Sequence, residues 1–189
     1  MVTFEPDQVA HFEAAGWRAY YDRRWLAVLV LMVRLGQEQF HIPFPLSLVA
    51  AYRVARASIA WAPVDNDPPA VERNLDAFYR LARRFSGLRF DPSRAAALEL
   101  RYWAEHRRLV GQEDKTAFLQ SLIDLHSHLF ELTPDEARES AELRVQASNT
   151  VDRITGRQST DPEADWRRLE QDLIGCYRSI VSASRAHSS

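Results

Sequence analysis

The stretch DPSRAAALELRYWAEHRRLV, residues 91–110, contains the signal that decides the fold. Asp91 can cap a helix N-terminus with its side chain, and Pro92 fits the first helical position, where an N–H is not needed. At about 100° per residue the apolar residues that follow fall on one side of a helix. Its two edges are formed by Ala95, Leu98, Tyr102 and Leu109 and by Ala96, Trp103 and Val110.

The same start signal recurs along the chain. A capping side chain precedes proline at Asp67, Thr133 and Asp161, and Thr133 is followed three residues later by Glu136, which makes a capping box. Helical periodicity fills the segments between these signals, and no convincing alternation typical of strands occurs. We predict helices at residues 7–40, 45–61, 68–86, 92–110, 115–131, 134–156 and 162–185.

These segments predict an all-α fold: a single helical bundle of about seven helices, mostly up-and-down because most linkers are short. Residues 1–189 are expected to form one domain, with the first two helices at its centre and the last few residues, SRAHSS, frayed.

The charge and composition of the chain limit the kinds of binding partner and the cellular location that we expect. The formal net charge of −2 gives no reason to expect nucleic acid binding. The longest apolar run, residues 25–33, is shorter than the roughly 20 residues of a membrane span, so we interpret it as a buried core helix. The N-terminal residues lack the pattern of a signal peptide. We therefore expect a cytoplasmic protein without a membrane partner.

Several charged or titratable residues project toward the apolar sides of the predicted helices. Glu99 and His106 lie in the middle of the apolar arc of residues 92–110, and Arg53 and Arg56 lie on a helix that is apolar nearly all round. A buried guanidinium needs a carboxylate or a ligand as partner, since it cannot lose its charge. The full inward set is Asp22, Arg53, Arg56, Glu99, His106, His126 and Glu170.

The inward residues suggest a site inside the bundle. Glu99 and His106 are candidate acid/base residues, and Arg53 and Arg56 are candidates to hold an anionic group of a small-molecule ligand. Carboxylate and imidazole also suit iron, manganese or zinc, so a divalent metal is a candidate cofactor. Its candidate ligands are Glu99, His106, His126 and Glu170. Glu99 and His106 are separated by about 10 Å along the helix, which fits a substrate pocket better than one shared ion.

Inward Glu and His on a helical bundle are similar in kind to the metal sites of ferritin-like and haem-oxygenase-like oxidases. Their di-iron pattern needs Glu-x-x-His twice, and this chain has it once, from Glu38 to His41. No residue of those families is carried over.

A second interpretation needs no site. The chain would be a non-catalytic interaction protein, a homodimer or a partner-binding protein. Its apolar first and second helices would supply the interface, and the inward polar groups would form ion pairs that fix helix register.

Overall fold

The computed structural model describes residues 2–186. Over these residues the chain forms eight helices and no strands, so the all-α prediction is confirmed. The mostly up-and-down arrangement and the single domain stay predictions, and residues 187–189 of the tail expected to fray lie outside the described residues. The helices are α1 (Pro6–Tyr21), α2 (Trp25–Phe40), α3 (Leu46–Trp61), α4 (Pro68–Ser86), α5 (Pro92–Leu109), α6 (Thr116–Phe130), α7 (Pro134–Thr155) and α8 (Pro162–Ala186).

The predicted helix starts are confirmed by their hydrogen bonds. The carboxylate of Asp91 accepts from the backbone N–H of Arg94 at 2.7 Å, and Asp67 and Asp161 each accept in the same way at 3.0 Å. The capping box of Thr133 and Glu136 at α7 is present in both directions. These bonds satisfy N–H groups that the first turn of a helix leaves without partners.

The prediction of one helix over residues 7–40 is wrong. α1 ends at Tyr21 and α2 begins at Trp25. Between them, Arg23 adopts a left-handed backbone with φ 58°, which a right-handed helix cannot contain. Asp22 caps the end of α1 and is exposed, so its predicted inward position is also wrong. The break lets α2 turn back and pack against α1.

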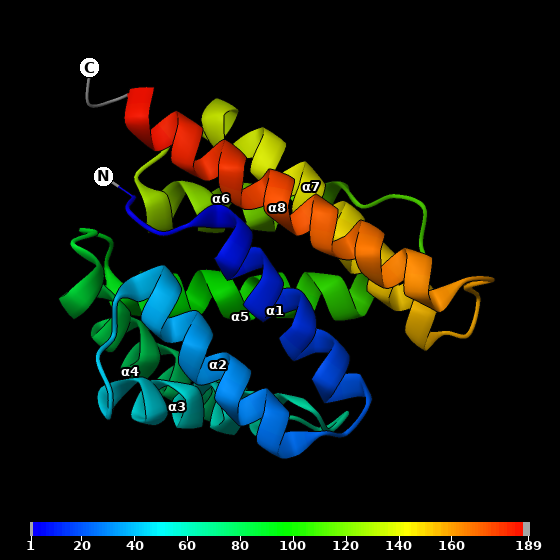
Figure 1. Ribbon diagram of the computed structural model, residues 1–189, viewed down its shortest axis with the longest axis horizontal. Coiled ribbons are helices and arrows are strands. Elements are labelled where there is room, and N and C mark those ends of the chain that lie inside the picture. Colours follow the sequence, from blue (N-terminus) through cyan, green and yellow to red (C-terminus); the bar gives the residue numbers. More distant parts are fainter. Residues whose placement is uncertain (1, 187–189) are drawn as a thin grey trace.

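Helices that follow each other along the chain pack together (Figure 1). α1 also packs against α8, so it lies between the α7–α8 pair and α2. A continuous core of buried apolar side chains extends from Val2 to Val181, and Phe118, Leu122, Leu169 and Leu173 are among its most buried members. The two ends of the described chain meet where Ser184 accepts the backbone N–H of Val2 at 3.0 Å.

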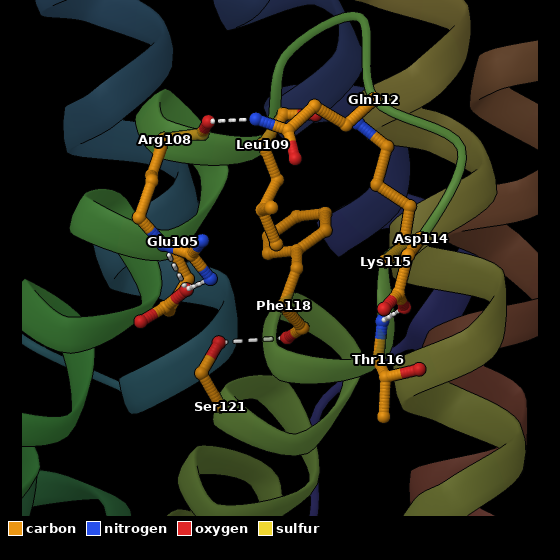
Figure 2. Close-up of polar contacts among 9 residues, drawn as sticks. All are labelled: Glu105, Arg108, Leu109, Gln112, Asp114, Lys115, Thr116, Phe118 and Ser121. Atoms are coloured by element: carbon orange, nitrogen blue, oxygen red, sulfur yellow. Dashed lines mark hydrogen bonds and ion pairs between the residues drawn. The ribbon is translucent and has the colours of Figure 1, made fainter.

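The connection from α5 to α6 is held by polar contacts (Figure 2). The Nζ of Lys115, the only lysine of the chain, donates to the carbonyl of Leu109 and so caps the end of α5. Asp114 accepts from the backbone N–H of Thr116 at 2.8 Å. Gly111 supplies the positive φ that the turn requires. The turn aligns α6 with α5 and so places Phe118 in the core.

The prediction places the segments 7–40 and 45–61 at the centre of the bundle. This prediction is wrong for α2 and α3, the two apolar helices of these segments. In α2 only Gly36 and Phe40 are buried, and Leu26 is 82 % exposed. In α3 the buried residues are Ser47 and the alanines 50, 51 and 57, which are small and allow close packing on α4. Many of the large apolar side chains of both helices are exposed, and α2 and α3 lie on the other side of α1 from α8 (Figure 1).

Candidate functional site

A buried ion pair joins the first and last thirds of the chain. Arg144 of α7 donates two hydrogen bonds of 2.6 Å to the two carboxylate oxygens of Glu13 on α1. The hydroxyl of Tyr177 on α8 donates to the same carboxylate at 2.6 Å. Side-chain exposure is 13 % for Arg144 and 8 % for Glu13. This geometry is the bidentate pairing that satisfies a desolvated guanidinium best.

Aromatic rings surround the guanidinium of Arg144. Its central carbon lies 5.1 Å from the ring centre of Trp17 and 6.0 Å from that of Tyr102. The Nε–H of the same guanidinium is buried and has no hydrogen-bond partner. The carboxylate of Glu13 and the ring faces together compensate the buried charge.

Glu99, which is partly buried, forms a second polar group beside this pair. Its carboxylate accepts from the indole N–H of Trp103 at 2.8 Å and from the hydroxyl of Tyr79 at 3.1 Å. Burial raises the pKa of Glu99, although the positive charge of Arg144 and the two hydrogen bonds oppose this rise. The predicted inward position of Glu99 is therefore observed, and its nearest polar groups come from α4 and α5.

His126 is buried in α6, as its position in the apolar arc indicated. Its Nδ1 lies 2.8 Å from the hydroxyl oxygen of Ser140 on α7. Since that hydroxyl donates to the carbonyl of Ala137 at 2.8 Å, the histidine Nδ1–H is the donor to it. Burial, and secondarily the charge of Arg144, lowers the pKa of His126 to about 3. The ring is neutral at neutral pH.

His106 is half-buried and pairs with Asp152 of α7, with 3.2 Å between Nε2 and a carboxylate oxygen. Its ring stacks on Phe118 with 5.1 Å between the ring centres. The stacking and the pairing together fix the orientation of the imidazole. No hydrogen bond between His106 and Glu99 is present, so the two candidate acid/base residues are not joined in the structure.

Glu170 is half-buried and pairs with His11 of α1 at 2.8 Å. Each of the four candidate metal ligands therefore has its own partner, and within residues 2–186 no three His, Cys, Asp or Glu side chains gather as an ion would require. The structure does not bring Glu99, His106, His126 and Glu170 together. Their roles as metal ligands or acid/base groups stay predictions.

The predicted burial of Arg53 and Arg56 is wrong, because both side chains are exposed on α3. The periodicity of α3 predicts a central helix, yet the outward side of α3 is apolar as well. A role for the two arginines in holding an anionic ligand stays a prediction. Two hollows on the surface, one beside Asp7 and Arg178 and one beside Glu72 and Ser93, include none of the predicted site residues.

Sequence reasoning missed Glu13 and Arg144, although signals for both were present. Glu13 is flanked on its helix face by Val9, Ala10 and Gly16, which are all buried. Arg144 lies one turn from the buried Ala141 and one turn from the buried Ser148. A charged residue in a row of small inward residues indicates a buried charge as well as close helix packing.

Large apolar side chains are exposed along α2, along α3 and in the loop between them, and we call this set the α2–α3 face. Its most exposed members are Leu26 at 82 % and Ile59 at 65 %. Large apolar side chains gathered on an exposed surface of this kind mark interaction sites in folded proteins. The face is formed by Trp25, Leu26, Leu29, Val30, Phe44, Leu48, Val49, Tyr52 and Ile59.

None of the helices within residues 2–186 has the length and apolar character needed to cross a membrane. Comparisons of the chain with protein-family models, with curated proteins and with solved structures found no match.

Proposed function

We propose that the protein is a helical interaction module that binds a partner protein through the α2–α3 face. One observation carries the proposal: α2 is the most continuously apolar segment of the chain, and in the folded protein four of its large side chains, Trp25, Leu26, Leu29 and Val30, are exposed. Exposing this surface to water has an unfavourable free energy of roughly 25 cal/mol per Å² of apolar area. Covering it with a partner removes that cost.

The buried hydrogen-bond network around Glu13 supports this proposal because it holds α1, the helix on which α2 packs. Glu13, Arg144 and Tyr177 connect α1, α7 and α8, and every oxygen of the Glu13 carboxylate already accepts a strong hydrogen bond. A carboxylate engaged in this way fixes the helices relative to one another, and it has little capacity left for a substrate. α1 then provides a rigid support for α2, which packs on it.

Native purification from the cells that make the protein tests the proposal. Tagged full-length chains are compared by size exclusion with light scattering: wild type, a Leu26→Glu/Ile59→Glu variant of the face, and Val110→Glu as a control. Val110 is 52 % exposed and lies at the end of α5, outside the face. We expect wild type and Val110→Glu to elute with one stoichiometric partner protein and the face variant to elute as a folded monomer.

Two results would contradict the proposal. A wild-type chain that is monomeric as purified leaves the face without a partner. A face variant that retains the complex locates the partner elsewhere on the molecule. Circular dichroism of each variant confirms that the chain is folded before its mass is interpreted.

A further inference from the structure

The α2–α3 face belongs to a strongly basic segment of an acidic chain. Residues 23–61 contain five arginines, no lysine, one glutamate and no other acidic residue. The segment therefore has a formal charge of +4, whereas the whole chain has −2 and the remaining residues have −6. The bordering exposed carboxylates Asp22, Asp65 and Asp67 reduce the formal charge of residues 22–67 to +1, so the positive charge of the face comes from Arg34, Arg53 and Arg56 along the helices.

Four of the five arginines have no acidic partner within the described chain. Arg23, Arg34, Arg53 and Arg56 are exposed, and none of them forms an ion pair with residues 2–186. Arg24 approaches Asp22 at 3.6 Å. Four guanidinium groups are thus available to carboxylates of another molecule.

The one acidic side chain of the segment is already in use. The carboxylate of Glu38 accepts a hydrogen bond of 3.1 Å from the backbone N–H of Glu5. It therefore contributes to the packing of α2 against the residues before α1, and it forms no ion pair with Arg34, which lies four residues earlier.

Helical spacing places three arginines along the apolar face. Arg34 follows the exposed Val30 by four residues on α2, and Arg53 and Arg56 follow Val49 and Tyr52 in the same way on α3. Residues four apart are neighbours on a helix surface. Each of these guanidinium groups therefore lies one turn beyond an exposed apolar side chain, where it can form an ion pair at the rim of an interface.

The excess of arginine over acidic residues on the face argues against a second copy of the chain as its occupant. In a twofold symmetric dimer the same patch contributes to both sides, so the arginines of one face would lie opposite a surface that carries only one glutamate. A single partner helix meets only the basic face, since screening limits charge effects to about 8–10 Å.

We infer that the occupant of the α2–α3 face is an amphipathic helix of a different protein, apolar on one side and flanked by Asp and Glu. This inference rests on the proposed function and adds the chemistry of the partner. The apolar side of the helix would cover α2 and α3, and its carboxylates would accept bidentate hydrogen bonds from Arg34, Arg53 and Arg56.

Two synthetic helices test the inference against the full-length protein. Both carry the same leucine stripe; one is flanked by glutamates and the other by lysines. Fluorescence anisotropy measures the affinity of each at low salt. We expect the glutamate helix to bind at least about tenfold more tightly than the lysine helix, with the preference decreasing as salt rises.

Charge-reversal variants locate the effect on the face. Arg53→Glu/Arg56→Glu should weaken binding of the glutamate helix about tenfold or more and strengthen binding of the lysine helix. Arg167→Glu/Arg168→Glu makes the same charge change at two exposed arginines of α8 and should leave both affinities unchanged. A control pair that shifts the affinities as much as the face pair overturns the inference.

Other outcomes separate this inference from the proposed function. Equal binding of both helices, abolished by Leu26→Glu, overturns the acidic partner and retains a docking face. A wild-type dimer dissociated by Arg53→Glu/Arg56→Glu identifies a second copy as the occupant and overturns the inference. Binding to vesicles that contain phosphatidylserine, with no binding of the glutamate helix, identifies a lipid surface and overturns it as well.

Discussion

Arg144 holds the carboxylate of Glu13 through two hydrogen bonds of 2.6 Å, although 131 positions separate the two residues in the sequence. Tyr177 donates to the same carboxylate, so one buried group connects α1, α7 and α8. Because α1 also supports α2, this ion pair determines indirectly where the α2–α3 face lies. The buried ion pair and the exposed face are therefore connected through α1.

Removing Arg144 alone should destabilise the protein strongly. In Arg144→Met the carboxylate of Glu13 stays buried without its cation, which typically costs about 3–5 kcal/mol. The double variant Glu13→Gln/Arg144→Met removes both charges and should recover a large part of that loss. Urea unfolding of both variants measures the difference. Losses that simply add would show that the two residues are not coupled.

Replacing Glu99 by glutamine should not destabilise the protein at neutral pH. The amide oxygen can accept the same hydrogen bonds from Trp103 and Tyr79, and the variant avoids burying a charge. Since the pKa of Glu99 is raised in the folded state, the unfolded chain loses its proton first as pH rises, and the wild type loses stability above the ordinary value of 4.5.

Unfolding titrations from acidic to neutral pH measure this effect. The free energies of unfolding of the wild type and Glu99→Gln should be similar below pH 4.5, and the variant should be equal or more stable at pH 7. A variant that is clearly less stable at pH 7 would mean that the ionised carboxylate itself stabilises the fold.

His126 should make the protein sensitive to acid. Its pKa is about 3 in the folded chain and near 6.5 when unfolded, so the unfolded state binds the proton first as pH falls. Stability should therefore decrease below pH 6.5, by up to about 1.4 kcal/mol per pH unit. His126→Asn, whose side chain can still bond to Ser140, should show a shallower decrease. The same slope in both proteins would assign the acid sensitivity to other groups.

The α2–α3 face should tolerate charge without loss of stability. Leu26 and Ile59 are largely exposed, so Leu26→Glu/Ile59→Glu should change the free energy of unfolding by only about 0.5 kcal/mol per site. Urea unfolding in the absence of a partner measures this. A loss of several kcal/mol would show that the two side chains are part of the core.

The sequence predicted most of the fold because its helix starts are local signals. Asp67, Asp91, Thr133 and Asp161 cap helices as expected. The break after Tyr21 was missed, since neither glycine nor proline marks it and Arg23 adopts a left-handed backbone that arginine rarely takes. Local patterns identify helices well, and they identify such breaks poorly.

The positions of apolar and charged residues relative to the core were harder to predict. Periodicity shows which side of a helix is apolar, and it does not distinguish a core from an interface. For this reason Trp25, Leu26 and Tyr52 were expected inside and are found at the surface. Glu99 and His126 were correctly expected to face inward. The pairing of Glu13 with Arg144 depends on contacts between distant helices, which no local pattern encodes.

Site-specific photocrosslinking tests the docking face most directly. A photoreactive phenylalanine analogue replaces Tyr52 on the face or Val110 outside it, and the cells that make the protein are irradiated. We predict one discrete crosslinked species from position 52, to a different protein, and none from position 110. No adduct from position 52, or the same adducts from both positions, would contradict the account.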